Sequence, residues 1–174
     1  MSKTIWSIDP THSEITFKVK HLMISNVKGE FKTFQANIDG EDFTKSTISA
    51  NIDASSISTN NNDRDTHLKS PDFFEVEKYP EITFVSKSIK KVDDDEYQLV
   101  GDLTIKGTTK EITLDTEFGG YMKDPYGNEK AGFSINGKLN RKDFGLNWNA
   151  ALEAGGVMVG NEIKINAEVQ FVKQ

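Results

Sequence analysis

Residues 97–105 read YQLVGDLTI and alternate between an apolar or small residue and a mostly polar one. Successive side chains of a β-strand point to opposite faces, so this two-residue period predicts a strand with one buried and one wet face. Three later segments repeat the same period over similar lengths, at residues 112–118, 133–139 and 163–171. The second half of the chain is therefore predicted to consist of long strands.

Shorter alternations occupy the first half, at residues 15–19, 34–38, 48–54 and 82–86. Phe31 is out of phase with the 34–38 set, which predicts a β-bulge near Lys32 and Thr33. The total is about eight strands, each with one apolar face, and this is the pattern of an antiparallel sheet.

Turn-forming sequences separate these strands, among them Asp39-Gly40, Lys106-Gly107 and Gly160-Asn161. Such short connections place strands that are neighbours in the chain beside each other in the sheet. A closed barrel removes the exposed edges that so many strands would otherwise have. We therefore expect an all-β, eight-stranded antiparallel barrel, with a two-sheet sandwich as the alternative.

The 174 residues suit one domain, predicted to span residues 1–174. The net charge of −6 argues against a nucleic-acid partner, and the absence of cysteine excludes disulfides and thiolate chemistry.

No apolar run is long enough to span a bilayer. Residues 1–6, MSKTIW, contain no apolar signal-peptide core, so a cytoplasmic location is expected, or a periplasmic one if a signal has been removed.

Residues 60–79 break the alternation and are rich in Asn and charged residues. Asn60 or Asn61 can cap a short helix that ends near Ser70-Pro71, so a helical insertion is expected around residues 61–75. Two more helical turns are expected, at residues 20–25 and at residues 141–152.

Small residues recur on the apolar phase of the predicted strands, at positions 36, 50, 101, 116, 137 and 167. They can allow barrel curvature, or fit against large side chains in a filled core. Alternatively, they leave a lumen into which many of the 11 Phe residues project. A lumen lined by Phe suits a hydrocarbon guest, because Phe offers no hydrogen-bonding group.

Four motifs in register carry a family resemblance. They are Asp9-Pro10-Thr11-His12-Ser13, Arg64-Asp65-Thr66-His67-Leu68 with Asp72-Phe73-Phe74, Gly101-Asp102-Leu103-Thr104-Ile105-Lys106-Gly107, and Asn140-Arg141-Lys142-Asp143-Phe144-Gly145. In this order and spacing, the chain resembles the YceI-like family over nearly its whole length. The second motif is the most specific of the four.

The resemblance implies a lipocalin-like barrel with a long apolar tunnel that holds a polyisoprenoid or a similar lipid chain. Many members carry a secretion signal and work in the bacterial periplasm. Members are also often seen paired, which leaves a homodimer open. A shared fold does not define a function, so the lipid ligand remains an implication of the resemblance.

Two groups of candidate site residues follow. We expect the lumen to be lined by Phe17, Val19, Phe84, Leu99, Leu103, Leu114, Phe133 and Ile135, with Phe73 and Phe74 partly closing it. The polar motif residues form the second group, expected at the barrel mouth: His12, Arg64, Asp65, His67 and Arg141. One interpretation is that they recognise a phosphate or carboxylate headgroup. The other is structural: Arg64 and Asp65 fasten the helix to the barrel rim, and His12 satisfies backbone groups at the first turn. The structural interpretation is favoured.

The sequence contains no catalytic motif, and its three His residues lack metal-ligand spacing. We therefore expect no cofactor, no metal and no catalytic residue, and a protein that binds or carries a long apolar lipid such as a polyisoprenoid, a quinone tail or a fatty amide or acid. Two alternatives remain: a barrel enzyme that uses His12 or Arg64 on a small apolar substrate, and a stress-linked structural protein with a filled core.

Overall fold

The computed structural model describes residues 4–149 and 158–174. These residues form one antiparallel sheet of 11 strands and one α-helix, α1 (Asn62–Leu68). The strands are β1 (Ile5–Ile8), β2 (Glu14–His21), β3 (Ser25–Phe31), β4 (Phe34–Asp39), β5 (Thr47–Asp53), β6 (Ile57–Ser58), β7 (Glu81–Lys91), β8 (Glu96–Ile105), β9 (Thr108–Lys123), β10 (Glu129–Asn140) and β11 (Val159–Lys173). Short 3₁₀ turns are η1 (Pro10–His12), η2 (Phe43–Lys45), η3 (Ala54–Ser56) and η4 (Arg141–Phe144).

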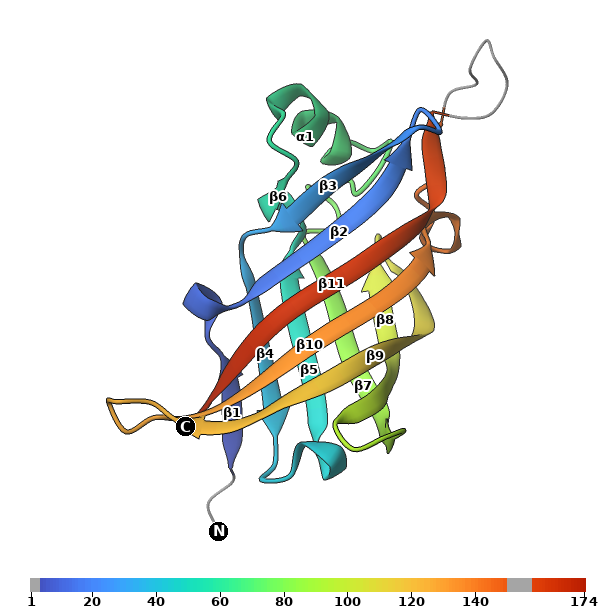
Figure 1. The fold of residues 1–174 in the computed structure, drawn as a ribbon. Coiled ribbons are helices and arrows are strands. Elements are labelled where there is room, and N and C mark those ends of the chain that lie inside the picture. Colours follow the sequence, from blue (N-terminus) through green and yellow to red (C-terminus); the bar gives the residue numbers. More distant parts are fainter. Residues whose placement is uncertain (1–3, 150–157) are drawn as a thin grey trace.

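The sheet closes on itself through β11 (Figure 1). One edge of β11 pairs with β10, and the other pairs first with β2 and then, near the C-terminus, with β1. β1 and β2 are thus two halves of one bent strand interrupted by η1, and β3 and β4 are two halves of the next. Counted in this way, the sheet is the expected closed barrel of eight antiparallel strands.

The break between β3 and β4 lies at Lys32 and Thr33, where the alternation predicted a bulge. The pairing register also changes there: Ile15 is opposite Phe31 on one side of the break, whereas Ser7 is opposite Asn37 on the other. The chain therefore turns from one part of the barrel wall to the next without leaving the sheet.

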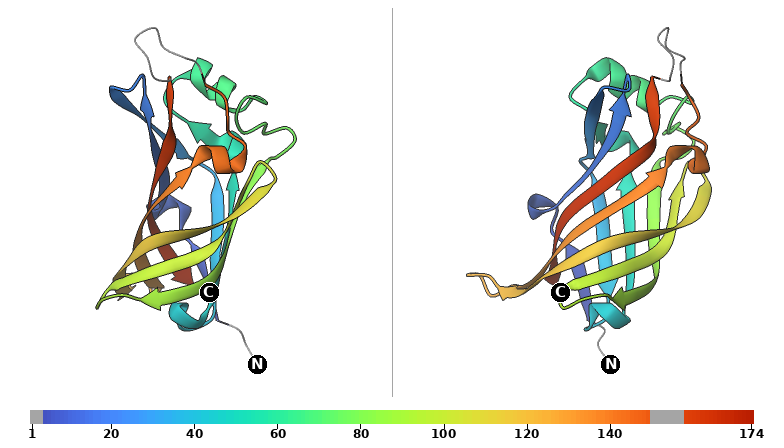
Figure 2. Two further views of the ribbon diagram at one scale, coloured as in Figure 1. Left: turned by 90° about the vertical axis from the view of Figure 1, so that its right-hand side faces the viewer. Right: turned by 45° about the vertical axis from the view of Figure 1, so that its right-hand side comes forward.

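Helix α1 confirms the predicted insertion and covers one end of the barrel (Figure 2). The Asn61 side chain accepts a hydrogen bond from the Arg64 backbone N–H at 3.0 Å, as a helix N-cap should. The helix expected at residues 20–25 was wrong, because β2 runs to His21 and a tight turn leads directly into β3.

The helix expected at residues 141–152 is reduced to the single 3₁₀ turn η4. Gly145 ends this turn with a left-handed backbone (φ 78°), a conformation that glycine adopts without steric cost. Residues 146–149 are irregular, and Leu152 lies outside the described residues.

The two ends of the barrel interior differ. Near the β1 end, the Phe43 ring packs against Tyr97, Phe118 and Phe133, with ring centroids 4.9–5.1 Å apart. We call this group, together with the buried Trp6, the aromatic plug. Toward the α1 end, many inward-facing side chains are only partly buried although they lie inside the barrel, because they border empty space.

The glycines on the apolar phase make room for side chains from neighbouring strands. A Cβ atom at Gly101 would lie 2.5 Å from both the Phe84 ring and the backbone oxygen of Val85. A Cβ atom at Gly137 would overlap a Leu114 methyl group. Large side chains from neighbouring strands therefore fill the space beside these two glycines. The two positions do not themselves create empty space in the barrel.

We expect Gly101→Ala to lower the free energy of unfolding by about 1–3 kcal/mol, because the backbone oxygen of Val85 cannot move away from the new methyl group. Denaturant unfolding of the purified variant measures this change. Gly132→Ala is the matched control: no atom lies within 4 Å of its Cβ position, so its effect should stay within about 0.5 kcal/mol. Equal losses for both variants would contradict the steric explanation.

Candidate functional site

The barrel encloses a cavity of about 620 Å³ that extends from the α1 end toward the aromatic plug. Most of the predicted lining residues border it: Phe17, Val19, Phe73, Phe74, Phe84, Leu99, Leu103, Leu114 and Ile135. The interior is thus hollow, and the filled-core alternative does not describe this barrel. The volume lies within the range of about 300–1,000 Å³ that is usual for ligand pockets.

Phe133 was wrongly placed in the cavity wall. It lies on the inward face of β10 like Ile135, but one step closer to the plug. There its ring contacts Phe43 at 5.0 Å and Phe118 at 5.2 Å between centroids, so it closes the cavity instead of lining it. The sequence period gives the face of a strand but not how far along the barrel the hollow part extends.

Three alanines supply much of the width of the cavity, and none was chosen as a site residue from the sequence. Ala36, Ala50 and Ala167 all border the cavity, and Ala36 is directly opposite Ala50 in the sheet. Their position among small residues on the apolar phase was the signal that could have identified them. Gly101, Thr116 and Gly137, from the same small-residue set, do not border the cavity.

Polar and charged lining residues gather near α1: Lys20, His21, Thr59, Asn61, Asp63, Arg64, His67 and Arg141. Lys20, Asn61 and Asp63 are exposed, and we therefore call this end the mouth. The deeper wall is formed mainly by aliphatic and phenyl side chains. Thr16 also borders it, but its hydroxyl donates to the Asn166 carbonyl oxygen at 3.1 Å.

Arg64 and Asp65 fasten α1 to the segment that follows β6. Arg64 Nε donates to Thr59 Oγ1 at 2.9 Å, while Asp65 Oδ1 accepts from the Thr59 backbone N–H at 2.8 Å and from its hydroxyl. These contacts favour the fastening interpretation of this pair. Arg64 also borders the cavity, so its guanidinium group stands at the mouth.

His67 belongs to a small aromatic group over the mouth. Its ring lies edge-on to Trp148 (4.7 Å between centroids) and to Phe73 (5.1 Å), and its Nε2 atom lies 2.9 Å from a carboxylate oxygen of Asp72. Trp148 falls within residues 141–152, where the sequence predicted only a helical turn. Its role in covering the mouth depends on the irregular path of residues 145–149, which no periodicity indicates.

Arg141 is buried, with 2% of its surface exposed, and it fastens the backbone. Its guanidinium donates to the carbonyl oxygens of Leu146, Trp148, Val159 and Gly160. It thus joins the segment after η4 to the start of β11. Burial lowers the pKa of Arg141, although a guanidinium stays protonated at physiological pH. Four of its five N–H donors are thus used within the protein, which favours a fastening role over its assignment as a headgroup ligand.

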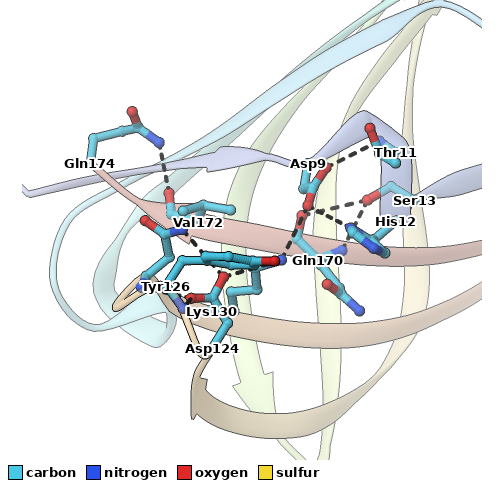
Figure 3. A network of polar contacts seen from close by, with 11 residues as sticks. Asp9, Thr11, His12, Ser13, Asp124, Tyr126, Lys130, Gln170, Val172 and Gln174 are labelled. Carbon is cyan, nitrogen blue, oxygen red and sulfur yellow. Dashed lines mark hydrogen bonds and ion pairs between the residues drawn. The ribbon is translucent and has the colours of Figure 1, made fainter.

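His12 does not lie at the mouth, which corrects its assignment to the rim. It ends η1 on the outside of the barrel, where its Nδ1 atom lies 2.8 Å from Asp9 Oδ2 (Figure 3). Lys130 lies 3.3 Å from the same carboxylate oxygen. The motif that contains His12 therefore holds the bend between β1 and β2, and it is separated from the cavity by the barrel wall.

Among residues 4–149 and 158–174, no group of three or more His, Asp or Glu is arranged to hold a metal ion. No helix in the same ranges is long and apolar enough to cross a bilayer.

We expect Arg141→Lys to lower the free energy of unfolding by at least about 2 kcal/mol, because one ammonium group cannot reach carbonyls on both segments and leaves buried acceptors unsatisfied. Thermal and denaturant unfolding measure the loss. Arg64→Lys is the control, since Arg64 is only partly buried and bonds a single residue, Thr59, through its side chain. An Arg141→Lys protein as stable as Arg64→Lys would refute this role.

A second prediction concerns the carboxylate in Figure 3. The hydrogen bond with His12, followed by those from Lys130 and the Thr11 backbone, lowers the pKa of Asp9 from its ordinary value of 3.8. A lowered pKa stabilises the fold above the ordinary value, and this stabilisation is lost as the pH falls through the folded-state pKa. Asp9→Asn should therefore cost about 0.5–1 kcal/mol at neutral pH and nothing well below pH 3.8. Unfolding measured across this pH range gives the difference, and a pH-independent loss would contradict it.

Comparison with known proteins identifies the family. The model of the YceI-like domain matches residues 6–171. A UPF0312 protein of Staphylococcus epidermidis is 48% identical over 171 residues, which cover 97% of both chains.

Solved structures give the same result. The YceI protein of Campylobacter jejuni is 40% identical, with a TM-score of 0.76 over 90% of this chain and 91% of its own. The polyisoprenoid binding domain from Saccharophagus degradans shares the fold, with a TM-score of 0.70, 15% identity and coverage of 97% and 98%. The match over almost the whole barrel, together with the identity to the Staphylococcus and Campylobacter proteins, shows that this chain belongs to the YceI-like domain family.

Proposed function

We propose that this protein binds one long apolar lipid chain in the barrel and shields it from water. The observation that carries the proposal is the cavity itself: about 620 Å³ of space inside a closed wall, with its charged lining residues gathered at one end. A folded protein interior is normally filled to the density of an organic crystal. A space of this size, lined by Leu, Ile, Phe and Ala, therefore indicates a guest of similar polarity.

The volume suggests the size of the guest. At about 30 Å³ per group, which is the share of one water molecule in the liquid, the cavity accommodates about 20 carbon atoms. This corresponds to about four isoprene units, or to a fatty chain of similar length. Each buried methylene contributes about 0.8 kcal/mol, so such a chain can bind tightly even after the entropy of association is subtracted.

The separation of polar and apolar lining residues suggests how the guest is oriented. The hydrocarbon tail would occupy the deep part of the cavity, where Ala50 and Phe171 belong to the wall. A polar headgroup would stay at the mouth, where Lys20, His21 and Arg64 can approach it. Apolar walls reject neighbouring chain types by only about 1–3 kcal/mol, so we expect the headgroup to contribute much of the selectivity.

The comparisons support a polyisoprenoid as the first ligand to test. The Saccharophagus domain with the same fold is described as polyisoprenoid-binding. The deep wall also supports binding over catalysis, because acid–base chemistry requires titratable groups and those bordering the cavity stand at its mouth. Carriage of the lipid between two locations is a further part of the proposal.

The direct test is to purify the full chain without added lipid, extract it with organic solvent and record a mass spectrum. We expect a long-chain apolar species in about stoichiometric amount. Protein that yields no such species should instead bind an added polyprenyl lipid or fatty acid with saturation at one molecule per chain. Failure of both measurements would refute the proposal.

A filled cavity should lose the ligand without losing the fold. Ala50→Leu places a larger side chain in the cavity beside Ala36 of β4 and Phe84 of β7. We expect the retained lipid to fall at least about tenfold while the melting temperature stays within a few degrees. Ser49→Leu is the matched control, because Ser49 precedes Ala50 on β5 and points to the outside of the barrel. Equal lipid content in the two variants would place the guest elsewhere.

A further inference from the structure

The turn between β2 and β3 exposes three consecutive large apolar side chains. Leu22 is 38% exposed, Met23 is 50% exposed and Ile24 is 85% exposed. Isolated exposed apolar residues are ordinary, but a contiguous group at the tip of a hairpin marks a surface that contacts another apolar phase. We call residues 22–24 the apolar tip.

The backbone of the apolar tip makes this exposure more informative. Leu22 and Met23 have φ values of 54° and 66°, in the left-handed region that Gly, Asn and Asp adopt most easily. The Ile24 N–H donates to the His21 carbonyl oxygen, which closes a turn with Leu22 and Met23 at its centre. A hairpin turn with positive φ at both central positions normally uses Gly, Asn or Asp there. Here the turn carries two large apolar side chains in spite of the unfavourable backbone conformation, so its composition is not explained by folding.

The apolar tip is beside the mouth of the cavity. His21, which precedes the tip, borders the cavity, and so does Val27 on the returning strand. The Leu22 N–H donates to the carbonyl oxygen of Met158 at 2.8 Å, and Met158 is another lining residue. Figure 1 shows the β2–β3 turn at the same end of the barrel as α1.

The segment that surrounds the tip, residues 18–28, carries a positive charge in an acidic protein. Residues 18–28 include three Lys and no Asp or Glu, whereas the whole chain has 27 acidic and 21 basic residues. Lys18 is directly opposite Lys28 on one side and Lys164 of β11 on the other. Like charges placed opposite each other on neighbouring strands destabilise a sheet, so this row suggests an anionic partner.

The row borders a surface groove that also contains Glu30, but no ion pair joins them in the described part of the chain. No salt bridge within the described residues joins Lys18, Lys28 or Lys164 to an acidic side chain. Glu162, two residues before Lys164, pairs with Lys138 at 3.5 Å. An apolar tip above unpaired lysines is the arrangement by which peripheral proteins bind an anionic bilayer: the apolar side chains enter the interface and the lysines meet lipid phosphates.

We propose that the β2–β3 hairpin docks this protein on the surface of an anionic lipid bilayer, with the mouth of the cavity turned toward the membrane. The partner is the bilayer itself, recognised by its hydrocarbon boundary and its phosphate layer. Docking would allow a lipid tail to pass between bilayer and barrel with little exposure to water, and this consequence rests on the proposed lipid-binding function. Docking alone does not require an occupied lumen.

The opposite end of the barrel provides an internal comparison. The β9–β10 hairpin also exposes apolar side chains, with Met122 at 74% and Tyr126 at 89%. Residues 117–129 around it contain three acidic residues and only one Lys. An anionic surface would repel this end, so exposed apolar area alone does not predict where docking occurs.

Vesicle co-sedimentation tests the proposal. The full chain is mixed with vesicles of phosphatidylcholine and phosphatidylglycerol in equal parts, and with vesicles of phosphatidylcholine alone. We expect binding to the anionic vesicles that decreases strongly near 1 M salt, where the Debye length is about 3 Å. Met23→Asn/Ile24→Ser should weaken the partition coefficient at least about tenfold, because both apolar groups are lost. Asn suits the left-handed backbone at position 23, so the turn itself is retained.

Two matched variants separate the docking surface from general effects. Met122→Ser/Tyr126→Ser removes a similar apolar group from the far end and should leave vesicle binding unchanged. Lys18→Gln/Lys28→Gln should weaken binding about fivefold per Lys, whereas Lys90→Gln/Lys91→Gln at the far end of β7 should have little effect. Thermal unfolding confirms that each variant is folded, and solvent extraction measures lipid content separately, so loss of docking and loss of lumen binding are distinguishable.

Three results would overturn the proposal. The first is wild-type protein that does not sediment with anionic vesicles. The second is an equal loss of binding in the near-end and far-end variants. The third is size-exclusion chromatography in which Met23→Asn/Ile24→Ser converts a dimer into a monomer without changing vesicle binding, because a second copy of the chain would then be the partner of the tip.

Discussion

Strand β11 holds the barrel closed by pairing along both edges, with β10 on one side and with β2 and β1 on the other. Because the barrel is closed, the backbone N–H and C=O groups of its wall find hydrogen-bond partners on neighbouring strands. The sheet therefore has no exposed edge along β11. The wall can then persist around empty space, because its hydrogen bonds do not depend on side chains filling the centre. The cavity, the plug and the mouth all depend on this closure.

The fold could be predicted from the sequence because its signal is local and repeated. The alternation in residues 97–105, 112–118, 133–139 and 163–171 belongs to strands that the structure contains. The Asn61 cap was equally local, since one side chain bonds to a backbone group three residues later. The turn after His21 was not recognised, because Leu22 and Met23 occupy a left-handed backbone that their residue types do not indicate.

The site was less predictable because its features depend on depth and on the path of the chain through space. Ile135 and Phe133 share one face of one strand, yet only the first borders the cavity, since Phe43 enters from η2 and packs against the second. The grouping of His12 with Arg141 also failed. The motifs suggested one polar cluster, but the two residues act in distant parts of the chain. His12 contacts Asp9 at η1, whereas Arg141 bonds the backbone at the start of β11.

The aromatic plug has a consequence for any guest that the lumen accepts. With Phe43 packed among three other rings, the β1 end of the interior is filled, and in the described part of the chain the lumen opens at the α1 end. A flexible tail must go in end-first and come out by the same route in reverse. The filled end therefore limits how deeply a tail can insert, and the part of a tail that exceeds the hollow section stays outside. The position of Phe43 thus determines the length of chain that the barrel can enclose.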